Sequence, residues 1–212
     1  MALYALVDAN NFYASCEKIF DPALADTPLV VLSNNDGCIV ARSAEAKALG
    51  IPMGAPMHQW RAFCDAHGVI SKSSNYTLYG DMSARMLSIL QDMCPQVESY
   101  SIDESFLDLS GYADARAYGQ LIRKRLQQNI KITCGVGIGA TKTLAKFANH
   151  LAKKQPEFAG VCQLSTDTPA RTRELMATYP VAEVWSVGRQ LSARLQANGV
   201  ETVLDLARCD PL

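Results

Sequence analysis

The sequence predicts an α+β fold, a mixed β-sheet with helices packed over one of its faces. Short apolar segments such as residues 3–7 and 29–32 have the length and composition of buried strands. Between such segments, apolar residues recur at helical spacing, as in the run from Met82 to Met93. Strands and helices that follow each other irregularly along one chain are typical of α+β domains, so this class is expected.

A hairpin and a short helix are expected early in the chain. After the strand at 29–32, the segment SNNDG at 33–37 supplies residues that tolerate positive φ. The chain is therefore expected to reverse there and to return as a strand over 38–41. Residues 43–49 favour a helix, and Gly50 is placed to end it.

The middle of the chain alternates strands and helices. Pro95 ends the helix that contains the Met82 to Met93 run. The segment IKITCGVGI, residues 130–138, alternates and is rich in β-branched residues, which predicts another strand. The other expected elements are strands over 97–102 and 105–109, helices around 118–126 and 142–154, and short helices after Pro169.

Two acids interrupt the otherwise apolar stretch SYSIDESFLDLS. Asp103 and Glu104 lie where two expected strands meet, and Asp8 follows the first strand of the chain. Three carboxylates at one end of a sheet repel one another and raise one another's pKa values unless divalent cations hold them. Oxygen ligands of this kind suit Mg²⁺ or Mn²⁺. For the Asp103 and Glu104 pair taken by itself, a simple polar turn remains the open alternative.

Charge is unevenly distributed along the chain, although the net charge is only −1. Residues 1–114 contain 6 Lys or Arg against 14 Asp or Glu, whereas residues 115–212 contain 14 against 7. The basic second half could face phosphate groups, or the helix surfaces could simply differ in charge.

Composition indicates a soluble globular protein. The seven cysteines are scattered singly without a CxxC pair, so neither a zinc cluster nor a disulfide framework is indicated. Reduced thiols in a cytoplasmic protein are expected. The start, MALYALVDANNFY, has no basic segment before its apolar residues, and no apolar run approaches the roughly 20 residues of a membrane span. Export and a membrane anchor are therefore not supported.

Five segments in order carry a family resemblance. They are LVDANNFYASCE, PLVVLSNNDGCIVARSAEAKALGI, YSIDESFLDLS, GVGIGATKTLAKFANHLAKK and VWSVGRQLSARL. Together they resemble the Y-family of translesion DNA polymerases, and most closely its UmuC branch. The resemblance implies a right-hand polymerase architecture with a catalytic palm over 1–18 and 76–165, small α/β fingers over 19–75, and an incomplete helical thumb over 166–212.

The same resemblance implies roles for the carboxylates. Asp8, Asp103 and Glu104 match the family's catalytic metal ligands, and the main-chain carbonyl of Ala9 matches a further ligand. Two Mg²⁺ ions, or Mn²⁺, would activate a primer 3′-hydroxyl and neutralise the triphosphate as pyrophosphate leaves. The implied function is the catalytic core of an error-prone, lesion-bypassing DNA-directed DNA polymerase in the SOS response to DNA damage.

Nucleotide-binding positions follow from the resemblance as well. Tyr13 matches the steric gate, an aromatic ring that would collide with a ribose 2′-hydroxyl. Asn11 and Phe12 begin the helix after the first strand, where free amides and the helix dipole favour a triphosphate. Lys47 and Lys153 match basic positions that contact the triphosphate. Many relatives have Arg at the first of these, and lysine offers a point charge instead of a bidentate fork, so a modest nucleotide affinity is expected.

Further positions are implied to contact the nascent base pair and the DNA. Cys38, Val40 and Gly54 match small residues that roof the nascent base pair and leave room for a damaged template base. A helix-hairpin-helix turn would present backbone amides to a duplex phosphate, and salt-sensitive DNA binding should follow. The residues implied to contact DNA are Lys142, Lys146, Ser186, Val187, Gly188, Arg189 and Arg194.

By the resemblance, the chain ends inside the thumb, and the little-finger domain and the C-terminal region are absent. Weak binding of primer-template DNA and poor activity are therefore expected of this fragment alone. The implied partners are primer-template DNA, deoxynucleoside triphosphates, a processed SOS accessory protein and the sliding clamp.

Two other functions remain open. The first is a catalytically deficient DNA-binding or regulatory fragment, and the second is a palm-type nucleotide cyclase. A cyclase would share the carboxylates but would need neither NNFYASCE nor the thumb hairpin.

Overall fold

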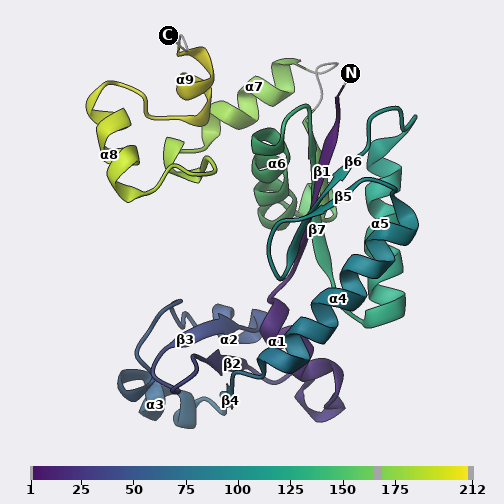
Figure 1. The fold of residues 1–212 in the computed structure, drawn as a ribbon. Helices are drawn as coiled ribbons and strands as arrows, with labels where there is room; N and C mark the ends of the chain where they lie inside the picture. Colours follow the sequence, from purple (N-terminus) through teal and green to yellow (C-terminus); the bar gives the residue numbers. More distant parts are fainter. Residues whose placement is uncertain (1, 165–168, 210–212) are drawn as a thin grey trace.

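Two β-sheets organise the described part of the chain, residues 2–164 and 169–209 of a computed structural model (Figure 1). The larger sheet has the strand order β5, β6, β1, β7, β8, and the smaller has the order β3, β2, β4. The strands are β1 (Tyr4–Ala9), β2 (Leu29–Leu32), β3 (Ile39–Arg42), β4 (Ile70–Ser73), β5 (Val97–Ser99), β6 (Glu104–Asp108), β7 (Cys134–Gly139) and β8 (Val161–Gln163). The predicted α+β class is confirmed.

Helices follow most of these strands. They are α1 (Phe12–Ile19), α2 (Ala44–Ala48), α3 (Met57–Ala66), α4 (Tyr76–Met93), α5 (Ala115–Ile130), α6 (Lys142–Lys154), α7 (Pro169–Thr178), α8 (Arg189–Ala197) and α9 (Val203–Arg208), with 3₁₀ turns η1 (Pro22–Leu24), η2 (Pro156–Phe158) and η3 (Val181–Glu183). No helix within residues 2–164 and 169–209 is long and apolar enough to span a membrane.

Strand β1 lies at the centre of the larger sheet, antiparallel to both β6 and β7. Side chains along a strand point alternately to opposite faces. Ala5, Val7 and Ala9 are buried in the cluster that contains the apolar residues of α4 and α5. Leu6 and Asp8 point to the opposite face, where α6 lies (Figure 1). The sheet therefore has one largely apolar face and one face that carries an acid.

Helix α6 shows that the expectation of helices on one face only is wrong. The glycines of β7 lie directly under this helix, and a Cβ atom at Gly137 would be 2.0 Å from the amide nitrogen of Asn149 and 2.1 Å from the carbonyl oxygen of Ala145. Only a residue without a side chain allows this approach. The alternation of apolar residues with glycine in GVGIG predicts a strand correctly. It does not indicate that a helix packs on the face of the glycines.

The β5–β6 hairpin is shorter than expected. Strands were predicted over 97–102 and 105–109, but the residues between β5 and β6 form a turn. In that turn, the amides of Tyr100 and Ser101 both donate to the carbonyl oxygen of Glu104, at 3.0 and 3.1 Å. The turn places Asp103 and Glu104, the two expected metal ligands of the hairpin, at the start of β6.

Two other boundaries can be compared with the sequence. The strand predicted over 130–138 begins at Cys134, because α5 continues to Ile130. Ile130 lies four residues after Leu126 and is buried with it, so the helical spacing outweighs the local β-branched pattern. The predicted helix end at Gly50 is confirmed, with the φ of +79° that favours glycine.

The smaller sheet has its own core. Strand β2 pairs antiparallel with β3 and parallel with β4, and the return strand predicted over 38–41 is confirmed as β3 with a shift of one residue. Val30, Ile39 and Met57 are buried there with residues of α2 and α3. The residues around this sheet form a separate unit, joined to the larger sheet through α1 and α4 (Figure 1).

Helices α7 and α9 pack on α6 through a third cluster. Phe147 and Leu151 of α6 are buried with Leu175 and Val203. The predicted turn before α8 exists, with Ser186 at a φ of +69°, but the element before it is the 3₁₀ turn η3 instead of a full helix. The expected palm and thumb boundary, between 165 and 166, and the last residues, 210–212, lie outside the described residues.

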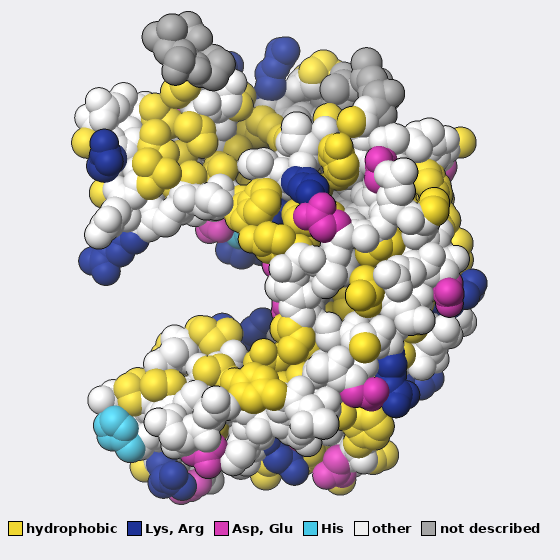
Figure 2. Space-filling model, viewed as in Figure 1, with side chains coloured by type: hydrophobic (Ala, Val, Ile, Leu, Met, Phe, Trp, Pro, Cys, Tyr) yellow, Lys and Arg dark blue, Asp and Glu magenta, His cyan; other side chains and the backbone are white. Residues whose placement is uncertain are grey.

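The three units together form an open C. Figure 2 shows a wide opening between the unit that contains α8 and the unit that contains α3.

All seven cysteines fall within the described residues and are free thiols, five of them buried, one partly buried and one exposed.

Candidate active site

The register between β1 and β6 brings the acids together. Asp8 lies directly opposite Glu104 in the antiparallel ladder. The next amide, that of Ala9, donates to the carbonyl oxygen of Asp103 at 2.9 Å. Because opposed residues share a face, Asp8 and Glu104 both point to the face that α6 covers. Asp8, which is far from Asp103 and Glu104 in sequence, thus lies with them at one end of the sheet.

Ser101 orders the two acids of the turn. Its hydroxyl donates to Oδ1 of Asp103 at 2.8 Å and accepts a hydrogen bond from the backbone amide of Glu104 at 3.1 Å. Sequence reasoning missed this residue, although a serine two positions before an acid is typical of a side-chain-capped turn.

Helix α6 supplies the partners of the carboxylates. Lys153 lies 2.6 Å from Oδ1 of Asp8, and Asn149 donates to Oδ2 of the same side chain at 2.9 Å. Lys146 lies 3.0 and 3.2 Å from the two carboxylate oxygens of Glu104. The three partners are spaced i, i+3 and i+7, so one stripe of α6 faces the acids. Asn149, which is buried, was missed; this spacing is the signal that could have found it.

A cleft of about 370 Å³ opens beside these residues. All five expected nucleotide-binding residues line it, namely Asn11, Phe12, Tyr13, Lys47 and Lys153. The expected metal ligands Asp8, Ala9 and Asp103 and the expected base-pair contact Val40 line it as well. It also contains residues that the sequence did not indicate, namely Ala41, Arg42, Met53 and Ile102. Among them, Arg42 is fixed by donating from Nη1 to the carbonyl oxygen of Ile51 at 2.6 Å.

Lys47 and Asn11 form one wall of this cleft. The ammonium of Lys47 donates to the side-chain oxygen of Asn11, whose own backbone is left-handed with a φ of +51°. Burial, followed by the nearby positive charges of Arg42 and Lys153, lowers the pKa of Lys47. An ammonium group beside two other cations favours an anionic ligand.

Tyr13 is held by two other tyrosines. Its ring stacks on Tyr79 with centroids 4.2 Å apart and planes 13° apart, and Tyr76 contacts it edge-on at 6.0 Å. Tyr79 is completely buried, and its hydroxyl donates to Glu17 at 2.8 Å. Burial raises the pKa of Tyr13, so its hydroxyl stays neutral. The sequence did not indicate Tyr76 or Tyr79 as supports of this ring.

Two residues expected to contact the base pair lie just outside the cleft lining. Cys38 pairs with Pro56 in an isolated bridge, and Gly54 donates its amide to the carbonyl oxygen of Ile39 at 2.9 Å. Their neighbours Val40 and Met53 line the cleft instead. The roles of Cys38 and Gly54 stay predictions.

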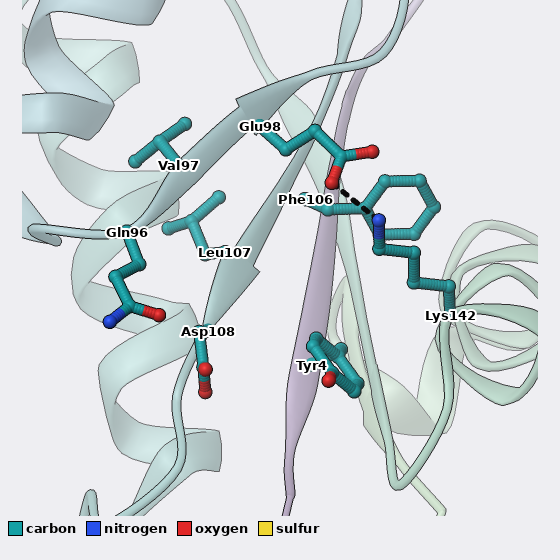
Figure 3. Close-up of a pocket in the computed structure, with 8 residues that line it drawn as sticks. All are labelled: Tyr4, Gln96, Val97, Glu98, Phe106, Leu107, Asp108 and Lys142. Atoms are coloured by element: carbon teal, nitrogen blue, oxygen red, sulfur yellow. Dashed lines mark hydrogen bonds and ion pairs between the residues drawn. The ribbon is translucent and has the colours of Figure 1, made fainter.

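Lys142 and Lys146 already have acidic partners. Lys142 is paired with Glu98 beside the Phe106 ring (Figure 3), and Lys146 is paired with Glu104. The Lys142 pair borders a second cavity, of about 350 Å³, over β5, β6 and β1. A contact of either lysine with DNA would require it to leave its acid.

The surface along α8 is more open. Gly188, Arg189 and Arg194 line a surface hollow of about 470 Å³. Both arginines are exposed, whereas the amide of Val187 is already used, since it donates to the carbonyl oxygen of Val184 at 2.9 Å. The arginines are therefore better placed to meet DNA than the amide of the turn.

Comparisons with known proteins place this geometry in context. The sequence model of the impB/mucB/samB family matches residues 7–150. Protein SamB of Salmonella typhimurium is 48% identical over 99% of this chain and 50% of its own length. Protein UmuC of the same species is 50% identical over 97% and 49%, and DNA polymerase IV of Moorella thermoacetica is 35% identical over 95% and 50%. The chain spans about half the length of these curated relatives.

Solved structures share the fold. An insertion ternary complex of Dbh DNA polymerase matches with a TM-score of 0.82, covering 98% of this chain and 61% of that one at 23% identity. DinB from Sulfolobus solfataricus matches with a TM-score of 0.80 over 98% of this chain and 60% of that one. The right-hand polymerase architecture expected from the sequence is confirmed.

Proposed function

Because the chain belongs to the impB/mucB/samB family, we propose that it forms the catalytic core of an error-prone, lesion-bypassing DNA-directed DNA polymerase of the DNA damage response. The observation that carries the proposal is the register of Asp8 opposite Glu104, with Asp103 beside them and Tyr13 and Lys47 in the same cleft as Asp8. In this proposal, residues 1–18 and 76–165 are the palm, 19–75 the fingers and 166–212 part of the thumb.

The substrates are primer-template DNA and deoxynucleoside triphosphates. A similar solved structure is an insertion ternary complex of a DNA polymerase, which supports substrates of this class. The opening of the C in Figure 2 offers room for a duplex next to the cleft. The exposed Arg189 and Arg194 of α8 would contact phosphates without reading sequence.

The carboxylates fit a pair of Mg²⁺ ions by their chemistry. Asp8, Asp103 and Glu104, with the carbonyl of Ala9, offer the hard oxygen donors that Mg²⁺ or Mn²⁺ prefers. Within residues 2–164 and 169–209, no three acidic, histidine or cysteine side chains are already gathered around one point. Two of the carboxylates hold lysine ammonium groups instead, so each has a place for a cation. Bound metal ions would supply charge that stabilises the attacking and leaving oxygens of phosphoryl transfer.

The protein's own side chains bind and select the nucleotide. Lys47 and Lys153 attract the triphosphate, and the amides at the start of α1, near Asn11 and Phe12, donate to it. The Tyr13 ring, fixed on Tyr79, leaves no room for a ribose 2′-hydroxyl. Deoxynucleotides are therefore preferred over ribonucleotides.

A second candidate is a DNA-binding or regulatory fragment without catalytic activity. Such a fragment would bind primer-template DNA equally well with Asp103→Asn. A palm-type nucleotide cyclase would instead convert a lone nucleotide to a cyclic product. We infer that the cellular setting is the cytoplasm, with a processed SOS accessory protein and the sliding clamp as partners of the longer protein.

Primer extension tests the proposal directly. A labelled primer-template is incubated with the chain, Mg²⁺ or Mn²⁺ and either deoxynucleotides or ribonucleotides. The expected result is extension with deoxynucleotides that disappears in the double variant Asp103→Asn/Glu104→Gln. Equal DNA binding by both proteins with no extension by either would support the non-catalytic fragment.

A further inference from the structure

The ammonium group of Lys146, in α6, contacts side chains from the β5–β6 hairpin and from the segment between η3 and α8. Its ammonium is 3.0 and 3.2 Å from the two carboxylate oxygens of Glu104. It is also 4.5 Å from the ring centre of Tyr100 and 5.2 Å from that of Trp185. The side chains of Lys146 and Glu104 are only 17% and 18% exposed, so water screens the contact weakly.

Trp185 comes from the C-terminal part of the chain. It lies between η3 and α8, and it joins the small apolar cluster of Leu6, Phe106 and Ala145 on the sheet face that carries the acids. Its ring meets Tyr100 edge-on with centroids 5.5 Å apart. At this point, the unit of α7 to α9 reaches the larger sheet beside the carboxylates.

We propose that Trp185 is a positioning residue for Glu104 and acts through Lys146. The faces of the two aromatic rings attract the ammonium group, and the same ammonium holds both oxygens of the carboxylate. A displacement of the Trp185 segment therefore loosens Lys146 on Glu104, and a change at Glu104 is transmitted back to Trp185. The inference deepens the proposed function, since its catalytic meaning rests on Glu104 as one of the carboxylates that would hold Mg²⁺.

Asp8 offers a contrast within the same site. Its two carboxylate oxygens are bonded to Lys153 and Asn149, both of which belong to α6. Asp8 is thus fixed by the helix packed on its own sheet, whereas Glu104 has a partner that also touches the α7 to α9 unit. Of the two opposed acids, Glu104 is therefore the one whose ion pair depends on the position of the α7 to α9 unit.

A double-mutant cycle tests this link in the full chain. Trp185→Phe keeps an aromatic face, whereas Trp185→Leu keeps an apolar side chain without one. Binding of Mn²⁺ alone is measured by electron paramagnetic resonance. Since a loosely held ammonium competes less for Glu104, the Leu variant should bind Mn²⁺ about threefold more tightly than the Phe variant. In the Lys146→Met background the two variants should bind equally. The matched control Trp60→Leu, in α3 beside the core of the smaller sheet, should leave Mn²⁺ binding unchanged.

The outcomes separate the link from simple packing. Equal Mn²⁺ affinity of the Phe and Leu variants with Lys146 present would overturn the proposal, and so would a difference that persists in Lys146→Met. A structural role alone would change the urea midpoint of unfolding in both backgrounds but not the Mn²⁺ affinity.

Tryptophan fluorescence supplies a second measurement that needs no metal and no Leu variant. In a Trp60→Phe chain, Trp185 is the only tryptophan left. Glu104→Gln should shift its emission when Lys146 is present and should have no effect in Lys146→Met. If the chain bound no Mn²⁺, the proposed metal site would fail, and this emission result alone would support or overturn the link. Unchanged emission in Glu104→Gln would overturn it.

Discussion

The two faces of the larger sheet are built from alternate residues of the same strands, yet they differ in kind. Toward α4 and α5, Val7 and its neighbours are buried in a largely apolar cluster, with Ser105 as a buried polar residue opposite Val7. Toward α6, Asp8 and Glu104 are met by Lys153, Asn149 and Lys146. Val7 and Asp8 are neighbours in β1, yet Val7 packs in the core and Asp8 is an expected metal ligand. Because side chains alternate along a strand, residues for stability and residues for catalysis lie on opposite faces of the sheet.

Adjacent residues of β1 provide the sharpest test of this division. Asp8→Asn should lower primer extension by about a thousandfold, because an amide cannot supply the anionic charge. Its pair with Lys153 is partly exposed, so the free energy of unfolding should change by less than about 1 kcal/mol. Val7→Ala should do the reverse, lowering the free energy of unfolding by about 2 kcal/mol and leaving extension nearly intact. Extension assays and urea unfolding of both variants measure this.

The comparison would fail if both variants lost activity in proportion to stability. Parallel losses would mean that the two faces are not separable and that Asp8 acts mainly through folding.

Glycine provides the next test, on the crowded α6 face. Gly137→Ala would place a Cβ atom 2.0 Å from a backbone nitrogen of α6, so we expect a loss of about 3 kcal/mol in the free energy of unfolding. The matched control is Gly80→Ala in α4, where a Cβ atom would have no neighbour within 4 Å. That change should stabilise the protein by up to about 1 kcal/mol, since alanine favours helix. Urea denaturation of the two variants gives both values, and equal effects would contradict the close packing of α6.

The same contrast explains what the sequence could predict. Apolar periodicity predicts β1, α4 and α5 because these elements bury a continuous apolar stripe. It does not predict on which face α6 lies, because the glycines of β7 carry no side chain to indicate a partner. The acids could be identified by their motif and their resemblance, whereas Asn149 and Ser101 act through hydrogen bonds that depend on tertiary placement. Tyr79 reads as a core aromatic until the stack with Tyr13 is seen.

Tyr13 is in contact with both sides of the larger sheet. It lines the cleft that contains Asp8, and its ring stacks on Tyr79 of α4. We expect Tyr13→Ala to raise ribonucleotide incorporation relative to deoxynucleotide incorporation by about a hundredfold. Tyr13→Phe keeps the ring on Tyr79 and should retain the selectivity. Single-nucleotide insertion rates for both sugars measure the ratio. A ratio that is the same in the Ala and Phe variants would show that another residue contacts the 2′ position.

The smallest expected effect concerns Lys47, whose charge lies in the cleft but whose position belongs to the smaller-sheet unit. Its pKa is lowered from 10.5 by burial and by the charges of Arg42 and Lys153. As pH rises toward 10.5, Lys47 loses its proton at a lower pH than a solvent-exposed lysine does. Nucleotide affinity should therefore begin to fall below pH 10.5. The unfolded chain keeps that proton longer, so the contribution of this group to the free energy of unfolding rises over the same range.

Lys47→Arg separates these two trends, because arginine stays charged and offers a bidentate fork. Nucleotide binding by the variant should be about threefold tighter and should not weaken as pH rises through this range. Fluorescence titration of a nucleotide at a series of pH values provides the measurement. Arg42 is present and charged in both proteins, so a difference between their pH profiles comes from residue 47. Identical pH profiles for the two proteins would place the anion at another cation of the cleft, such as Lys153, and would leave Lys47 as a support for Asn11 alone.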